Sequence, residues 1–220
     1  LNLPSTLRYL NANFGNRAQF TGELLLPEGI IEATAPSGNF SGSLYFPESL
    51  KEISGSWGYS NMTGTVTIPR CMTKVHAFCF KNGGYNHVEF HDGITEIEAE
   101  AFQKCNLQGE LVLPPNLRKI GGSAFASTKI SKIIFNDELR IIDNGNYNFE
   151  GAFCNNPYLT GTLTLPKNVV RIPAGCFRNC PGITELVIPE GVDYIDELAF
   201  DGCNGIGSIV SYATEPPVLA

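Results

Sequence analysis

One pattern of apolar and polar positions recurs along the chain: apolar, polar, glycine, any residue, apolar, any residue, apolar, proline. It occurs at residues 20–27, 40–47, 62–69, 107–114 and 159–166. In each copy, two apolar residues separated by one unrestricted position predict a short β-strand with one buried face. Proline has no N–H and ends the strand at the same place each time, and the glycine indicates a bulge-like turn before the strand.

The residue that follows each predicted strand marks a repeat of about 23 residues. The shortest step, from Pro27 to Pro47, is 20 residues, and the longest, from Asn136 to Pro166, is 30. Two further apolar positions follow each of these anchor residues at fixed offsets, as Leu117 and Ile120 do after Pro114. The ten anchors are Pro4, Pro27, Pro47, Pro69, His91, Pro114, Asn136, Pro166, Pro189 and Tyr212.

A repeat of this length cannot close a core alone, so its apolar positions must pack against those of the neighbouring repeats. We therefore predict a stacked, mainly β solenoid whose short strands pair in a parallel sheet, about 4.8 Å apart. Five phenylalanines occupy one repeat position and predict an aromatic column inside the stack. They are Phe80, Phe102, Phe125, Phe177 and Phe200.

Three segments carry a family resemblance: "VTIPRCMTKVHAFCF" (66–80), "LPPNLRKIGGSAF" (113–125) and "ITELVIPEGVDYIDELAFDGC" (183–203). They resemble the BspA-type bacterial leucine-rich repeat, and the match spans nearly the whole chain. The resemblance implies a right-handed superhelix with a concave parallel sheet and short turns or 3-10 segments on the convex side. It also implies a secreted or cell-surface bacterial protein without enzyme activity.

The repeat register also predicts how the chain is organised. We expect one leucine-rich repeat domain over residues 1–220, with about nine coils. The coil at 28–47 should be irregular because it loses the register of the aromatic column, and an insertion is expected at 143–151. Both chain ends fall inside a coil, so further sequence is expected upstream, such as a linker and a lipid anchor.

Composition narrows the class of protein and of partner. The 220 residues are 43% hydrophobic and 17% charged, which indicates a folded, soluble chain. No apolar run approaches the roughly 20 residues that cross a bilayer. The net charge of −7, with only 15 Lys and Arg, argues against nucleic acid as a partner.

Five of the seven cysteines fall on core positions of the repeat. Cys105, Cys180 and Cys203 lie three residues after a column phenylalanine, and Cys79 and Cys176 lie just before one. A free cysteine packs as a small hydrophobe, so we predict buried thiols. A Cys180–Cys203 disulfide between adjacent coils is the minority alternative.

Histidines provide the only hint of metal or catalytic chemistry. In "HVEFH", His87, Glu89 and His91 should share the solvent face of a strand. His87 and Glu89 could hold a weak two-ligand metal site, but His87 and His91 are too far apart, about 13 Å, to share an ion. An ordinary solvated strand face is the favoured interpretation. The sequence contains no G-x-S-x-G, H-E-x-x-H or phosphate-loop motif, so we expect neither enzyme activity nor a cofactor.

Function should therefore lie on the outward strand positions, which vary without disturbing the core. The predicted binding residues belong to the central outward column, which begins at Asn2 and Leu25. They are Tyr45, Thr67, Glu89, Val112, Ile134, Thr164, Val187 and Val210. The valines and Ile134 would form an apolar strip on a continuous platform from about Leu107 onward; equally, they could reflect the preference of strands for β-branched residues.

Two non-enzymatic functions remain. The first is an adhesin-like module on the outer cell surface or secreted, which recognises an unknown host or bacterial protein or glycan through the concave sheet. The second is a structural spacer within a longer surface array. Tyr45, Trp57 and Tyr59 would favour a glycan if they formed an exposed aromatic cluster.

Overall fold

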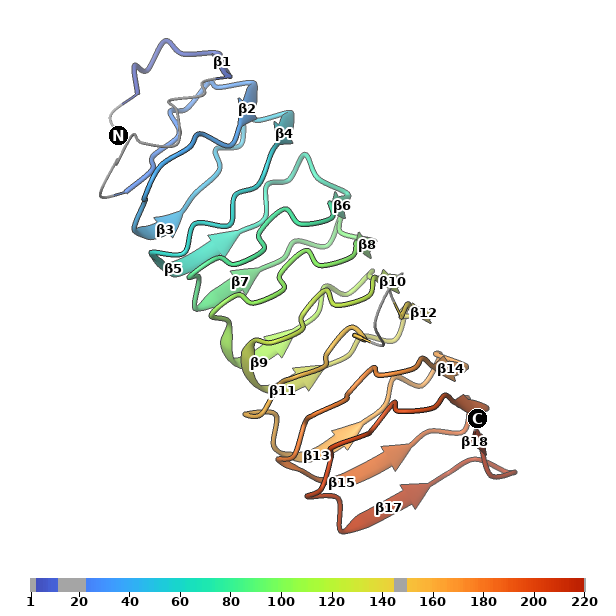
Figure 1. Ribbon diagram of the computed structural model, residues 1–220. Helices are drawn as coiled ribbons and strands as arrows, with labels where there is room; N and C mark the ends of the chain where they lie inside the picture. The colour runs from blue at the N-terminus through green and yellow to red at the C-terminus, as the bar shows by residue number, and fades with distance from the viewer. Residues whose placement is uncertain (1–2, 12–22, 145–149, 220) are drawn as a thin grey trace.

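The computed structural model describes residues 3–11, 23–144 and 150–219. The chain forms an elongated stack of coils, with the N-terminus at one end and the C-terminus at the other (Figure 1). The described residues contain no helix. Asn2 and residues 145–149 of the predicted insertion lie outside the described residues.

The longer strands lie side by side on one face of the stack, which we call the strand face. They run parallel to one another and comprise β3 (Gly42–Leu44), β5 (Met62–Thr67), β7 (His87–Glu89), β9 (Gln108–Val112), β11 (Lys129–Ile134), β13 (Gly161–Thr164), β15 (Ile183–Ile188) and β17 (Ser208–Ser211). Each anchor residue then starts a tight turn, in which, for example, Leu117 N–H donates to the Pro114 carbonyl at 3.1 Å.

A second set of parallel strands covers another side of the stack and, among the described residues, forms three separately hydrogen-bonded groups that we together call the return sheet. Each strand contains the second of the two apolar positions that follow an anchor. Ile97 and Ile120, for example, are partners in adjacent parallel strands. The strands of the return sheet are β1 (Tyr9–Leu10), β2 (Glu32–Thr34), β4 (Glu52–Ser54), β6 (Lys74–Val75), β8 (Glu96–Ile97), β10 (Lys119–Ile120), β12 (Ile141–Ile142), β14 (Arg171–Ile172), β16 (Tyr194–Ile195) and β18 (Val218–Leu219). These strands and the turns occupy the region where turns or 3-10 segments were expected, and no described residue is in a 3-10 helix.

The aromatic column is confirmed and gains a member. Phe80, Phe102, Phe125, Phe153, Phe177 and Phe200 stack with ring centroids 5.3–5.6 Å apart and planes within 4–9° of parallel. Phe153 was missed because the 30-residue step shifts it from the expected offset. Its "GAF" context matches the other members, so the small residue before the ring is a better signal than the count.

The edge of the stack that carries the column is also joined by backbone hydrogen bonds. Phe102 N–H donates to the Ala124 carbonyl at 2.8 Å, and Phe125 N–H donates to the Ala152 carbonyl at 2.8 Å. Phe153 N–H continues the series to the Cys176 carbonyl at 2.9 Å. This edge therefore holds the coils in register through the irregular 30-residue step.

The N-terminal coils pack their aromatic residues differently, as the lost register predicted. Phe40 lies edge-on to Tyr59, with centroids 5.0 Å apart, and Phe46 lies edge-on to Trp57 at 4.9 Å. Trp57 and Tyr59 are only 0% and 8% exposed, and both use their polar atoms inside the protein. Tyr45, Trp57 and Tyr59 therefore do not form the exposed aromatic cluster that would have favoured a glycan, because of the three only Tyr45 faces solvent.

The cysteines occupy the predicted core positions. All seven are free, and all except the half-buried Cys71 are buried. Cys105 donates its S–H to the Phe80 carbonyl at 2.8 Å, and Cys203 donates to the Phe177 carbonyl at 3.0 Å. These thiols therefore link each coil to the phenylalanine of the coil before it.

We expect native protein to react with a thiol reagent at Cys71 at most. Burial raises the pKa of the Cys79 and Cys105 thiols to about 12, so little thiolate is present at pH 8. After unfolding in guanidinium without reductant, the same assay should count seven thiols. A count of five or fewer would show a disulfide, with Cys180–Cys203 the first pair to examine.

Candidate binding surface on the strand face

The outward column of the strand face has the predicted orientation. Leu25, Tyr45 and Val112 are 53%, 49% and 58% exposed, whereas the alternating residues Val66 and Leu111 are buried in the core. The column two residues earlier faces outward as well and is linked across coils by polar contacts, such as Thr162 Oγ1 donating to Glu185 Oε2 at 2.8 Å. The strand register derived from the repeat is therefore correct.

The expected continuous platform is wrong, because the strand face is divided into three sheets. These are β3-β5-β7, β9-β11 and β13-β15-β17. In the described residues, a backbone hydrogen bond bridges the first break at the start of β7 and β9, where Gln108 N–H donates to the Asn86 carbonyl at 3.0 Å. The second is bridged by Thr160 N–H to the Ser131 carbonyl at 3.1 Å. Beyond these points the strands diverge.

Both breaks follow a strand whose last inward residue is phenylalanine and whose anchor is not proline. Phe90 lies edge-on to Phe102, the column ring that follows it in the chain, at 5.8 Å, and Phe135 lies edge-on to Phe153 in the same way at 5.7 Å. An edge-on ring occupies more space between coils than the leucine or isoleucine found before most other anchors. Phe46 also lies edge-on to another ring, but it precedes a proline anchor and no break follows β3. We therefore attribute the separation of the strand ends to a phenylalanine combined with an anchor that is not proline.

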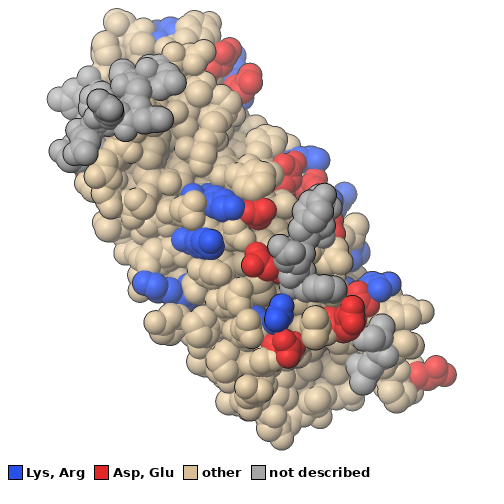
Figure 2. Space-filling view, viewed as in Figure 1, with Lys and Arg blue, Asp and Glu red and all other residues tan. Residues whose placement is uncertain are grey.

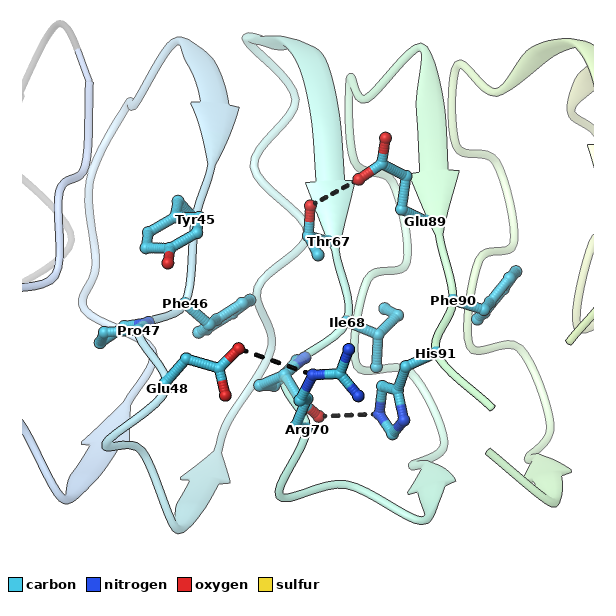
Figure 3. A pocket seen from close by; sticks show the side chains of 11 residues that line it. Tyr45, Phe46, Pro47, Glu48, Thr67, Ile68, Arg70, Glu89, Phe90 and His91 are labelled. Carbon is cyan, nitrogen blue, oxygen red and sulfur yellow. Dashed lines mark hydrogen bonds and ion pairs between the residues drawn. The ribbon is translucent and has the colours of Figure 1, made fainter. Parts of the chain in front are cut away.

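The first group of predicted residues lines a hollow at the C-terminal ends of β3, β5 and β7, which we call the N-terminal groove. It has a volume of about 280 Å³. Tyr45, Thr67 and Glu89 form one row on the strands, while Glu48, Arg70 and His91 form a second row on the turns that follow (Figure 3). The groove therefore runs across the coils, along the length of the stack.

The polar groups of the N-terminal groove hold one another in place. Thr67 Oγ1 donates to Glu89 Oε2 at 3.1 Å. Arg70 lies 3.5 Å from a Glu48 carboxylate oxygen and 4.0 Å from one of Asp92, and all three side chains are largely exposed. Such exposed pairs contribute little to stability, about 0–1 kcal/mol each, so their main effect is to orient the groups.

Both ring nitrogens of His91 are hydrogen-bonded to the main chain of the protein. Its Nδ1 accepts a hydrogen bond from Gly93 N–H at 3.1 Å, so Nε2 carries the proton and donates to the Pro69 carbonyl at 3.1 Å. His87 and Glu89 are exposed neighbours on β7, but Glu89 is bonded to Thr67. In the described part of the chain, no three His, Cys, Asp or Glu side chains converge where they could hold a metal ion.

The second group lines a larger hollow, the C-terminal groove, where β11 and β13 diverge. It has a volume of about 490 Å³ and includes Ile134, Thr164 and Val187. Tyr212, which is 67% exposed, lies at its margin. A Lys167–Asp137 ion pair at 2.8 Å links the turns on either side. The groove thus combines apolar side chains with a polar border.

Two of the predicted binding residues lie in neither groove. Val112 and Val210 are exposed, at 58% and 36%, but they flank the grooves on β9 and β17. Prediction from the strand columns alone missed the turn residues that complete each site. Glu48, Arg70 and Lys167 each directly follow a proline anchor, so a polar residue at that position was the available signal.

Charged side chains of both signs occur elsewhere on the surface, with an excess of acidic residues over the whole chain. Basic and acidic side chains are interspersed on the visible face, without a large patch of one sign (Figure 2). On the return sheet, Glu96 lies 2.7 Å from Lys74 and 3.4 Å from Lys119, and the hydrogen bond from Lys74 lowers the pKa of Glu96. On the face shown in Figure 2, the described residues present no continuous basic track for a phosphate backbone.

The repeat pattern, the stacked coils and the phenylalanine column agree with a comparison of the sequence with known families. The sequence model of one family, described as "BspA type Leucine rich repeat region", matches residues 31–152 and 149–214, in six copies. The chain belongs to the BspA-type leucine-rich repeat family. Repeat proteins of this kind present extended surfaces that bind other macromolecules.

One solved structure shares the fold of this BspA-type chain, and a second shows a more distant likeness. A leucine-rich repeat protein of T. pallidum is 24% identical over 67% of this chain and 72% of its own, with a TM-score of 0.54. A leucine-rich cell surface protein of Faecalibacterium prausnitzii A2-165 is 17% identical over 86% of this chain and 72% of its own, with a TM-score of 0.36. No curated protein matches the chain. The described residues contain no helix that could span a membrane.

Proposed function

We propose that this protein is a non-catalytic binding module that recognises a partner protein through the C-terminal groove of the strand face. One observation carries the proposal: Ile134, Thr164 and Val187, predicted as binding residues from the repeat, line one groove of about 490 Å³. An apolar floor with a polar border is the usual arrangement of a protein interface, in which a few central residues supply most of the binding energy.

The main chain at the second break supports the same proposal. Thr160 N–H, just before β13, donates to the Ser131 carbonyl of β11. Main-chain groups alternate in direction along a strand, so every second residue further along β11 and β13 directs its N–H and carbonyl toward the groove. A partner segment could add hydrogen bonds there while it buries apolar side chains against Ile134 and Val187. We further propose that the protein acts on the outer cell surface or after secretion, in keeping with its BspA-type repeats.

The test is the combined variant Val112→Glu, Ile134→Glu and Val187→Glu. A partner is first identified on an array of extracellular-matrix proteins, and its affinity is then measured for each variant. Loss of a central interface residue costs about 2 kcal/mol or more, so the combined variant should bind at least about 100-fold more weakly. Its melting temperature should stay within about 3 °C, because these side chains lie outside the stacked core.

Leu25→Glu is the matched control. Leu25 is 53% exposed in the same outward column but lies in neither groove, so this variant should bind normally. Unchanged affinity in the combined variant would remove the C-terminal groove as the binding site. Absence of any partner on the array would favour the structural-spacer function.

A further inference from the structure

We propose that the N-terminal groove is a separate binding site for a neutral carbohydrate chain, with one sugar ring stacked on Tyr45. The site lies on the coils of β3, β5 and β7, whereas the C-terminal groove lies on those of β11, β13 and β15. It does not depend on the function proposed for the C-terminal groove.

An exposed aromatic ring at the wall of a polar hollow is the first observation. Tyr45 is 49% exposed, although Phe46, beside it in sequence, is buried below the groove. A tyrosine ring presents a flat apolar face and a hydroxyl at its edge. The C–H groups of one face of a sugar ring fit this surface, while the hydroxyl groups at the sugar's edge remain free to hydrogen-bond.

Polar side chains stand where the edge of such a sugar would lie. Thr67 and Glu89 continue the row of Tyr45, and Glu48 and Arg70 face them from the turns (Figure 3). The Thr67–Glu89 hydrogen bond orients one donor and one acceptor before any ligand arrives, and the exposed Glu48–Arg70 pair brings a carboxylate and a guanidinium to the opposite side. Sugar hydroxyls both donate and accept, so they match a mixed set of carboxylate, guanidinium and hydroxyl groups.

The charge of the groove excludes an anionic ligand. Glu48, Glu89 and Asp92 outnumber the single guanidinium of Arg70, which already lies beside two carboxylates. A uronate, a sialylated glycan or a phosphate would meet net negative charge. The class of ligand is therefore neutral, or else cationic.

Main-chain pairing separates this groove from a site for an extended peptide. The central strand β5 is hydrogen-bonded to β3 on one side and to β7 on the other. It has no free edge to which a peptide strand could add, and the free edge of β7 faces the break toward β9, on the side away from β5 and Tyr45. A ligand that contacts Tyr45, Thr67 and Glu89 is therefore recognised through side chains. The groove crosses successive coils, which suits a chain of sugar units laid along the stack. Its volume of about 280 Å³ is near the lower end for small-molecule sites, about 300–1,000 Å³.

The experiment is an array of neutral, acidic and basic glycans probed with the full chain, with tetralysine peptide tested separately. Titration calorimetry then measures the affinity of the best glycan for each variant. We expect binding to neutral glycans, a loss of at least about 10-fold in Tyr45→Ala, and a change of less than about 3-fold in Tyr45→Phe, which keeps the ring. Glu89→Gln should weaken binding by about 3- to 10-fold, since it weakens a charge-assisted acceptor.

Ile134→Glu and Val187→Glu should leave this affinity unchanged, which distinguishes the site from the C-terminal groove. The proposal is overturned if no neutral glycan binds, if binding survives Tyr45→Ala, or if acidic glycans bind better than neutral ones. Preferential binding of tetralysine would also overturn it and would identify the groove as a site for cationic peptides.

Discussion

Phe102→Ala should lower the free energy of unfolding by about 3–5 kcal/mol. The Phe102 ring is fully buried and stacks on Phe80 and Phe125 at 5.3 Å on both sides, and Phe90 contacts its edge. Its removal leaves a cavity that three other rings line, and the hydrogen-bonded coils cannot close it. Chemical denaturation monitored by circular dichroism measures the effect.

Phe78→Ala is the control for the loss of a phenylalanine. Phe78 lies only two residues before the column but is 48% exposed. Its replacement should change stability by less than about 1 kcal/mol, mainly through the contact of its ring with Lys81. Equal losses in Phe78→Ala and Phe102→Ala would contradict the stacked column as a source of stability.

Asn156→Ala should cost about 2–4 kcal/mol, the second largest effect expected. Asn156 is fully buried in the coil that contains the 30-residue step from Asn136 to Pro166. Its Oδ1 accepts from Thr128 N–H at 2.9 Å and from Thr128 Oγ1 at 2.6 Å, and its Nδ2 donates to the Phe125 and Phe153 carbonyls at 3.0 and 2.8 Å. Alanine would leave several of these buried groups without a partner, at about 1–3 kcal/mol each before relaxation.

Two variants test this explanation by denaturant titration. Asn156→Cys should lose less than Asn156→Ala, because Cys180 and Cys203 occupy the same repeat position and donate to the preceding phenylalanine carbonyl. Asn116→Ala, at an exposed residue with one bond to the Asp92 carbonyl, should stay within about 0.5 kcal/mol. If Asn156→Ala lowers the free energy of unfolding as little as Asn116→Ala does, Asn156 does not stabilise the coil of the 30-residue step.

The surface positions divide less simply between sequence and structure. Period-2 alternation placed Tyr45, Val112 and Val187 on the outward side correctly, because a strand that buries one face exposes the other. It could not show that these positions belong to different hollows. The two breaks coincide with Phe90 and Phe135, whose ring contacts appear only when the coils are stacked.

The sequence by itself determined the solenoid, the strand register, the buried thiols and the phenylalanine column. Each follows from a local period that repeats about every 23 residues, and stacking then forces equivalent residues together. Tertiary structure alone decided the two breaks in the strand face, the place of Phe153 in the column and the network of Asn156. These features join residues of different coils around an irregular step, where no local period specifies which side chain meets which. Both candidate grooves depend on such contacts between coils, so the sequence indicated the candidate face but only the structure located the candidate grooves on it.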